Sequence, residues 1–326
     1  MGSLAVDVRK VVIITGATVS PPSPSPMSNP LVGHRPDFCD KQSGIGRDLA
    51  HRLHARGYKV ALTGRRVAEG EALAQSLDKT GQTTLFAECH AESYDSQKAV
   101  FKAVWDKWQR VDALIANAGI VDKESRYGLT KRGASVDDVP PCPDLGCDDA
   151  DFKGVVYGTE LFRHYARHNP PGVKGKIVVT GSIVAIYPCP TFPEYCAVKA
   201  AALQWVRVMA PVLLLKENIT INTVLPNAYD TGIMPDFKEA YLDEHLTQKE
   251  CMMSAYDVFL EDEAHIKTGQ AVETAYDSHF YHNVPAYKSG NVIERTDKVY
   301  EPWFQWMHGE TSGLPNAYKE ALRTMA

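Results

Sequence analysis

Short β-branched runs alternate with amphipathic segments along most of this chain, and this alternation constrains the fold more than any other feature. The runs at Lys10–Thr15, Lys59–Thr63 and Thr83–Glu88 have the length and composition of buried strands. The segments Ile45–Gly57 and Ala68–Thr80 between them repeat apolar residues at helical spacing. Strands that alternate with helices of this length indicate parallel βαβ units. The sequence therefore predicts an α/β protein with one doubly wound parallel sheet and helices on both faces.

The same alternation continues through most of the remaining chain. Residues 1–275 are therefore expected to form a single domain. Residues 276–326 carry scattered aromatic side chains and are expected to form an irregular C-terminal extension rather than a second domain. We expect further helices at Tyr94–Trp108, Asp148–His168 and Tyr195–Glu217, and further strands at Ala113–Ala116, Lys176–Thr180, Ile219–Val224 and Ala271–Glu273.

Charge and apolar content exclude several classes of protein. The net charge is −5, from 35 Lys and Arg against 40 Asp and Glu, and there is no basic block, so a nucleic-acid partner is not expected. No apolar run approaches the ~18 residues that span a bilayer, and the N-terminus lacks a signal pattern, which predicts a cytoplasmic protein without a membrane partner. The seven cysteines form no Cys-x-x-Cys pair and no zinc spacing with histidine, so we expect reduced thiols and no metal site.

A proline-rich segment interrupts the first βαβ unit. Val19–Gln42 has 24 residues with six prolines and four serines, a composition unsuited to a strand or a helix. Loops at this place in α/β units usually have ~2–6 residues. Val-Ser at its start can be encoded by a splice donor and Gln at its end by a splice acceptor, so one hypothesis is a retained in-frame intron. The alternative is a genuine functional loop.

The residues on either side of this insert join into a glycine-rich turn, Thr-Gly-Ala-Thr-Ser-Gly-Ile-Gly. Gly16 and Gly44 would let the backbone approach a pyrophosphate, and Gly46 would let strand and helix pack closely. The helix that begins near Ile45 would point its free N–H groups at phosphate. Because the turn follows a strand and opens a helix, it predicts a dinucleotide site that includes Gly16, Ser43 and Ile45. The joined turn resembles the motif TGxxxGIG of the short-chain dehydrogenase/reductase family, which implies a Rossmann-type sheet and a nicotinamide cofactor.

The resemblance extends to the type of nicotinamide cofactor. After the second strand the chain reads Gly64-Arg65-Arg66, whereas NAD-binding members of the family place an Asp at the Gly64 position. A glycine followed by an arginine suits the 2′-phosphate of NADP, which a guanidinium can pair bidentately. We therefore expect NADP(H), with Arg65 as a contact, and NAD remains the alternative.

Four further cofactor contacts are implied by the resemblance. His90 stands where the family usually has an Asp against adenine, and Asn117 opens an Asn-Ala-Gly turn that matches the family. The stretch from Pro226 to Thr231 stands where the family has Pro-Gly-x-x-x-Thr. Thr231 is expected there to hold the nicotinamide carboxamide, and Tyr229 is expected to contact the cofactor.

The pattern Tyr-x-x-x-Lys occurs three times, beginning at Tyr94, Tyr127 and Tyr195. The family places a serine 13 residues before its catalytic tyrosine, at the end of a strand, and only Tyr195 has one, Ser182. The resemblance implies that Tyr195, whose ordinary pKa is about 10, exchanges the proton of the reaction. Lys199, one helical turn away, would stabilise its phenolate and hold the nicotinamide ribose, and Ser182 would orient the substrate oxygen.

One position in the catalytic set departs from the family. Asp151 stands where the family has an Asn that relays protons through water to the lysine. A carboxylate can still bind water, but it changes the charge balance at Lys199. With the interrupted glycine turn and His90, this departure leaves open an impaired or inactive nucleotide-binding homologue. A family member that performs dehydration or epimerisation is another alternative.

The resemblance covers residues 8–275 without the insert and is strongest to fungal members related to hydroxyprostaglandin dehydrogenases. It implies an NADP(H)-dependent oxidoreductase that interconverts a secondary alcohol and a ketone, and a homodimer or homotetramer formed through the two long helices. Val121–Cys147 and Thr231–Leu260 are expected to wall the substrate pocket. Because the second of these stretches is rich in apolar and aromatic residues, we expect a small lipophilic substrate, as in fungal secondary metabolism.

Overall fold

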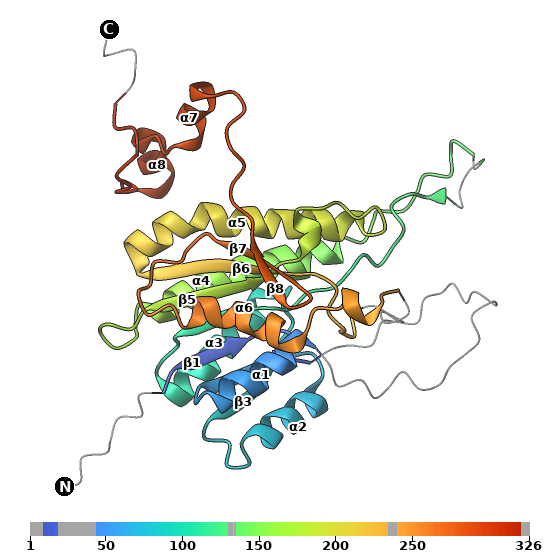
Figure 1. The fold of residues 1–326 in the computed structure, drawn as a ribbon, viewed down its shortest axis with the longest axis vertical. Coiled ribbons are helices and arrows are strands. Elements are labelled where there is room, and N and C mark those ends of the chain that lie inside the picture. Colours follow the sequence, from blue (N-terminus) through green and yellow to red (C-terminus); the bar gives the residue numbers. More distant parts are fainter. Residues whose placement is uncertain (1–8, 19–43, 130–132, 134, 234–239, 321–326) are drawn as a thin grey trace.

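One eight-stranded sheet forms the centre of the molecule (Figure 1). The structure is a computed structural model that describes residues 9–18, 44–129, 133, 135–233 and 240–320. Its strand order is β3-β2-β1-β4-β5-β6-β7-β8, and every neighbouring pair is parallel except β7 with β8. The predicted α/β fold with a doubly wound parallel sheet is confirmed. The strands are β1 (Val11–Ile14), β2 (Lys59–Gly64), β3 (Thr84–Glu88), β4 (Ala113–Ala116), β5 (Gly175–Thr180), β6 (Ile219–Pro226), β7 (Ala271–Ala275) and β8 (Ser278–Tyr281).

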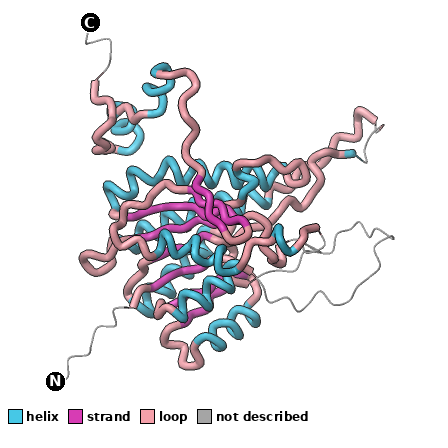
Figure 2. Tube along the Cα trace, viewed as in Figure 1, coloured by secondary structure: helices cyan, strands magenta, loops and turns pink. Residues whose placement is uncertain are grey.

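Helices cover both faces of the sheet (Figure 2) and enclose two cores. Because successive side chains of a strand point to opposite faces, β1 sends Val12 and Ile14 into one core and Val11 and Ile13 into the other. The first core is covered by α1 (Ile45–Ala55), α2 (Val67–Leu77) and α6 (Lys249–Leu260), and the second by α3 (Tyr94–Trp108), α4 (Gly154–Ala166) and α5 (Pro193–Glu217).

The order of the strands determines where a ligand can bind. From β1 the chain first moves outward to β2 and β3, and then crosses to β4 on the other side of β1. Ligands of such sheets bind at this switch point, beyond the carboxyl ends of the strands. The glycine turn after β1, the Asn-Ala-Gly turn after β4 and Ser182 after β5 all lie at this edge.

Helix α6 corrects one expectation from the sequence. The sequence predicts that the stretch Thr231–Leu260 walls a substrate pocket, and for the part that forms α6 this prediction is wrong. Met252, Met253, Tyr256 and Phe259 are at most 1% exposed and belong to the core that α6 forms with α1 and the sheet. The apolar content of Lys249–Leu260 therefore reports core packing and says nothing about the substrate.

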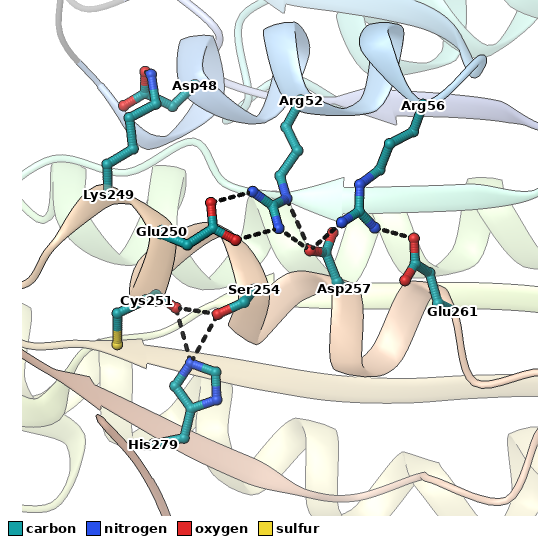
Figure 3. Close-up of polar contacts among 10 residues, drawn as sticks. All are labelled: Asp48, Arg52, Arg56, Lys249, Glu250, Cys251, Ser254, Asp257, Glu261 and His279. Atoms are coloured by element: carbon teal, nitrogen blue, oxygen red, sulfur yellow. Dashed lines mark hydrogen bonds and ion pairs between the residues drawn. The ribbon is translucent and has the colours of Figure 1, made fainter. Parts of the chain in front are cut away.

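A network of ion pairs joins the other side of α6 to α1 (Figure 3). Arg52 of α1 pairs with Glu250 at 2.8 Å and with Asp257 at 2.5 Å. Arg56 also pairs with Asp257, at 3.1 Å, and Lys249 pairs with Asp48 in the first turn of α1. These ion pairs thus fix α6 to α1, the helix that follows the glycine turn.

The predicted helix Asp148–His168 begins irregularly. Its first six residues, Asp148–Lys153, form a π-helix that continues directly into α4. Such π-turns are rare and often occur at functional sites. Here the π-turn contains Asp151, whose side chain is buried.

The C-terminal extension has more regular structure than the sequence indicates. It contains β8, α7 (Asn291–Asp297) and α8 (Glu301–His308), and the part with α7 and α8 lies beside α5, away from the sheet (Figure 1). Lys216 of α5 pairs with Glu310 at 3.0 Å, and the buried Glu301 accepts hydrogen bonds from the backbone and side chain of Ser312. Each of these elements has at most eight residues, which is too short for a hydrophobic period to predict it from the sequence.

Among the described residues, α5 has the length and composition of a membrane-spanning helix, with a mean hydropathy of 1.5 over its most apolar window. In the structure it lies along the sheet, and Val206, Ala210 and Leu213 belong to the second core. Burial in that core explains part of its apolar composition, whereas Val208 and Leu215 of the same helix are exposed.

Candidate active site

The structure brings Ser182, Tyr195 and Lys199 together at the carboxyl end of β5. Ser182 is the second residue after the strand, is 8% exposed, and caps a short turn by accepting a hydrogen bond from Val184 N at 3.4 Å. Tyr195 and Lys199 lie in the first two turns of α5, and Lys199 Nζ is 5.4 Å from the centre of the Tyr195 ring. Ser182 lies close enough to Tyr195 to lower the pKa of its phenol.

Lys199 is buried between a carbonyl group and a carboxylate. Its side chain is 4% exposed, and Nζ donates a hydrogen bond to Thr180 O at 3.0 Å. Asp151 Oδ2 lies 3.1 Å from the same nitrogen, while Asp151 Oδ1 accepts a hydrogen bond from Ile120 N at 2.8 Å. A β-carbon at Gly119 would lie 2.7 Å from Asp151 Oδ2, so only glycine leaves room for this ion pair.

These contacts change the pKa values of the three groups. Burial raises the pKa of the Asp151 carboxyl above its usual range. Burial by itself would lower the pKa of Lys199, but the charges of Asp151 and Tyr195 raise it overall, so the ammonium stays protonated. Burial also raises the pKa of Tyr195; Lys199 and Ser182 act against this rise, whereas Asp151 adds to it. The site therefore holds a neutral phenol beside a buried ion pair.

Asn117 connects the ends of three strands. Its Nδ2 donates hydrogen bonds to Thr15 O at 3.1 Å and to Gly16 O at 3.2 Å, and its Oδ1 accepts one from Thr180 Oγ1 at 3.1 Å. The Thr180 hydroxyl also bonds to the hydroxyl of the buried Tyr256, 2.8 Å away. Asn117 thus fixes the glycine turn after β1 relative to the catalytic group after β5.

The two halves of the glycine turn meet in space although 24 residues separate them in sequence. Gly16 has φ +66°, and a β-carbon there would lie 2.7 Å from Ala118 Cα. A β-carbon at Gly46 would lie 2.7 Å from Gly16 O. Helix α1 begins at Ile45 without a side-chain cap from Gly44. The insert and Ser43, a predicted cofactor contact, lie outside the described residues.

The end of β2 is packed tightly against the glycine turn. A β-carbon at Gly64 would lie 2.0 Å from Thr18 Oγ1 and 3.3 Å from Thr18 N. Arg65, which follows, is exposed, and Arg66 pairs with Glu69 at 2.7 Å. An aspartate at residue 64 would therefore force the Thr18 side chain to move.

His90 and Thr231 have few contacts, whereas Tyr229 is part of the protein interior. His90 is exposed between Glu88 and Glu92, which lie 3.6 and 3.4 Å from its ring nitrogens. Thr231 is partly exposed on the loop after β6. The hydroxyl of Tyr229 donates a hydrogen bond to Asp48 Oδ2 of α1 at 2.7 Å, and burial raises the pKa of this phenol. The side chain of Tyr229 therefore packs against α1 rather than beside Tyr195.

Asp122, which no motif of the sequence indicates, is also part of this region. Both of its carboxylate oxygens accept backbone hydrogen bonds from the first turn of α5, from Glu194 N at 3.0 Å and from Tyr195 N at 2.9 Å. No local pattern indicates this contact, because 73 residues separate Asp122 from Tyr195.

A family model described as short chain dehydrogenase matches residues 41–242. The chain belongs to the short-chain dehydrogenase family. This enzyme is thus an oxidoreductase of that family, and the resemblance found in the sequence is confirmed. The short-chain dehydrogenase/reductase prx6 of Penicillium rubens is 44% identical over 278 residues, which cover 85% of this chain and 92% of that protein. The 15-hydroxyprostaglandin dehydrogenase [NAD(+)] of Mus musculus is 28% identical over 222 residues, which cover 66% of this chain and 76% of that protein.

Solved structures of short-chain dehydrogenases share the fold at low identity. The 3-ketoacyl-(acyl-carrier-protein) reductase of Brucella melitensis, complexed with NADH, matches with a TM-score of 0.61 and 22% identity, over 81% of this chain and 96% of that chain. An alcohol dehydrogenase of Thermococcus sibiricus, complexed with 5-hydroxy-NADP, matches with a TM-score of 0.59 and 19% identity. This match covers 86% of this chain and 100% of that chain. The family binds a nicotinamide cofactor, and one of these two structures holds NADH whereas the other holds a derivative of NADP.

Proposed function

We propose that this short-chain dehydrogenase is an NADP(H)-dependent oxidoreductase that interconverts a secondary alcohol and a ketone. One observation carries the proposal: Ser182, Tyr195 and Lys199 meet at the end of β5, beside the glycine turn that Asn117 connects to them. Asp151 is the residue that separates this site from the family pattern.

The residues around the switch point fit a dinucleotide. The turn packs so closely at Gly16 and Gly46 that a β-carbon at either would meet neighbouring backbone atoms, and the uncapped start of α1 at Ile45 presents its N–H groups beside this turn. We assign the pyrophosphate to this helix start and the nicotinamide ribose to Tyr195 and Lys199. The cofactor, when bound, supplies or accepts the hydride.

In the proposed mechanism the chain itself handles the proton. During reduction the Tyr195 hydroxyl donates its proton to the substrate oxygen, and during alcohol oxidation the phenolate takes it back. Ser182, which lies beside Tyr195 at the end of β5, orients the substrate oxygen. The Lys199 ammonium stabilises the phenolate between these steps, and Asp151 keeps that ammonium charged in its buried position.

The preference for NADP(H) rests on the end of β2. Residue 64 carries no carboxylate that would take both hydroxyls of an NAD ribose, and Gly64 packs against the Thr18 side chain instead. Arg65 is exposed at that edge and can pair with a 2′-phosphate. The prostaglandin dehydrogenases among the relatives carry NAD(+) in their names, so NADH is the control ligand. Arg65→Ala should weaken NADPH binding about tenfold and leave NADH binding unchanged, since an exposed guanidinium–phosphate pair contributes about 1.4 kcal/mol.

For the substrate we propose a small lipophilic secondary alcohol or ketone. Helix α6 no longer supports this, but Ile183 and Val184, directly after Ser182, are partly exposed. The similarity to a Penicillium rubens enzyme favours a role in fungal metabolism, including secondary metabolism.

We also propose a cytoplasmic enzyme that assembles as a homodimer or homotetramer through α4 and α5.

For Val19–Gln42 we propose a retained intron in a domain that spans residues 1–275. The family match begins at residue 41, near the end of the insert, which supports this reading. Sequencing of cDNA tests it directly: transcripts that lack the 24 codons are expected, and transcripts that keep them would reject the proposal.

The function is tested by binding and turnover on the chain as written and on the chain without Val19–Gln42. NADPH and NADH binding is followed by quenching of tryptophan fluorescence, and turnover by NADPH oxidation with an aromatic ketone or quinone as probe. We expect NADPH to bind more tightly than NADH and to be consumed. Binding without consumption across a panel of such probes would favour an impaired homologue. Conversion of a substrate at a constant NADPH/NADP ratio would favour a dehydratase or epimerase.

A further inference from the structure

Helix α5, which carries Tyr195, begins without a cap of its own. Phe192 occupies the cap position and makes no side-chain hydrogen bond, and Pro193 opens the helix. Proline has no N–H, so the first donors that need acceptors are the amides of Glu194 and Tyr195. In most helices a Ser, Thr, Asp or Asn at the cap position would accept them.

Asp122 performs this task from a distant segment. Its Oδ1 accepts from Glu194 N at 3.0 Å and its Oδ2 from Tyr195 N at 2.9 Å. A negative charge is favourable at the N-terminus of a helix, where the backbone dipoles leave positive charge. One of the two bonds ends on the backbone of the catalytic tyrosine itself.

The rest of the segment around Asp122 is joined to the same turn of α5. Arg126 forms an ion pair with Glu194, whose Oε1 accepts a hydrogen bond from Cys147 N at 3.0 Å. Two residues before Asp122, Ile120 N donates to Asp151. Both ends of the segment from residue 120 to 147 are therefore fixed to the catalytic region.

We propose that Asp122 is a positioning residue for the reaction, which sets the place of the Tyr195 hydroxyl by capping α5 in place of Phe192. The proposal rests on the proposed function of Tyr195. Lys199 is held independently, by Thr180 O and Asp151. Loss of the cap would therefore move Tyr195 relative to a lysine that stays in place.

The test compares Asp122→Asn with Asp137→Asn. The first variant keeps the side-chain shape but can accept only one of the two N–H groups, because its amide nitrogen is a donor. Asp137 is an exposed aspartate of the same segment, so its variant removes the same charge. With NADPH and an aromatic ketone or quinone as probe, we expect kcat of Asp122→Asn to fall about 10–100-fold, as for small misplacements of a reacting group. NADPH affinity should stay within about twofold, because the glycine turn is untouched.

A second measurement needs no substrate. The ionisation of Tyr195 is followed by tyrosinate absorbance, as the difference between each variant and the same variant carrying Tyr195→Phe. In Asp122→Asn the midpoint should move to higher pH, since a hydroxyl displaced from Lys199 loses the cation that lowers its pKa. Asp137→Asn should titrate like the wild type.

The outcomes separate this inference from the proposed function. Asp122 is not a positioning residue if Asp122→Asn and Asp137→Asn show the same pH midpoint for the ionisation of Tyr195. Where the probe is turned over, the two variants would then also have the same kcat. If Tyr195→Phe turns the probe over as fast as the wild type, the proposed function fails, and the titration still decides whether Asp122 positions the tyrosine. Unchanged far-UV circular dichroism and NADPH affinity are required of each variant, and a variant that fails them is replaced by Asp122→Ser, which loses one acceptor oxygen.

Discussion

The glycine turn and the catalytic group lie at the same edge of the sheet, but different interactions hold them. At the glycine turn, backbone atoms are in van der Waals contact, and Gly16, Gly46 and Gly64 leave no room for a side chain. At the catalytic group, charges and hydrogen bonds dominate, with Lys199 between Thr180 and Asp151. We infer that the cofactor end of the site is specified by shape and the proton-transfer end by charge. Substitutions at the two ends should therefore fail in different ways.

The largest effect is expected from the charged end. Lys199→Met removes the ammonium that stabilises the phenolate, so turnover should fall about 10²–10⁴-fold, the usual contribution of general acid–base groups. It also leaves Asp151 buried without its partner, at a cost of about 3–5 kcal/mol if the carboxylate stays ionised. Urea unfolding of Lys199→Met and of the double variant Lys199→Met with Asp151→Asn measures this cost. The double variant should be the more stable of the two; equal stability would mean that Asp151 carries no charge in the folded protein.

The next largest effect is expected from the turn. In Gly46→Ala the new β-carbon meets Gly16 O at 2.7 Å and Ala17 Cα at 3.0 Å, both backbone atoms that cannot rotate away. We expect a loss of about 1–3 kcal/mol in stability and a clear loss of NADPH binding by fluorescence quenching. Gly172→Ala serves as the control, because a β-carbon there meets nothing within 4 Å and only backbone strain is added. Unchanged NADPH binding by Gly46→Ala would contradict the view that shape specifies this end.

A smaller effect, on pH dependence, is expected from Asp151→Asn. The negative charge of Asp151 raises the pKa of Tyr195, so its removal should lower that pKa. In alcohol oxidation the tyrosine acts as a base, and activity rises with pH as it loses its proton. The rising limb of kcat/KM against pH should therefore move to lower pH. A limb that moves to higher pH would mean that Asp151 acts mainly by keeping Lys199 protonated.

The smallest effect is expected from the ion pairs that support the turn from outside (Figure 3). Arg52 reaches Glu250 and Asp257 of α6, and its side chain is 17% exposed. Because water screens such pairs in part, Arg52→Ala should lower the free energy of unfolding by about 1 kcal/mol, measured with urea. Turnover per folded molecule should not change, and Arg56→Ala, at a more exposed pair, should cost less.

The same contrast explains how much could be predicted from the sequence. The glycine turn and the set of Ser182, Tyr195 and Lys199 carry fixed spacings, so both were found although an insert splits the turn. Tyr229 stays a predicted cofactor contact from its position in a motif. The hydrogen bond of its hydroxyl to Asp48 could not be predicted, because a side-chain direction of this kind depends on the tertiary packing.

Other features had no local signal. Met252, Tyr256 and Phe259 have helical spacing, but nothing in the sequence distinguishes a helix that covers the core from one that faces a substrate. The cap from Asp122 to α5 joins residues far apart in the chain, and no periodicity reports such a contact. The strand β8 has only four residues, which is too few for a clear strand pattern, and it pairs antiparallel with β7 after a short turn.

Tyr195→Phe tests the central claim most directly, because it removes one hydroxyl and leaves the shape of the site intact. NADPH binding and the reduction of an aromatic ketone or quinone are measured on the same preparations of wild type and variant. The account predicts NADPH affinity within about twofold of the wild type and turnover reduced about 10²–10⁴-fold. Turnover at the wild-type rate, or turnover lost only together with NADPH binding, would contradict the separation of a shape-determined cofactor end from a charge-determined proton-transfer end.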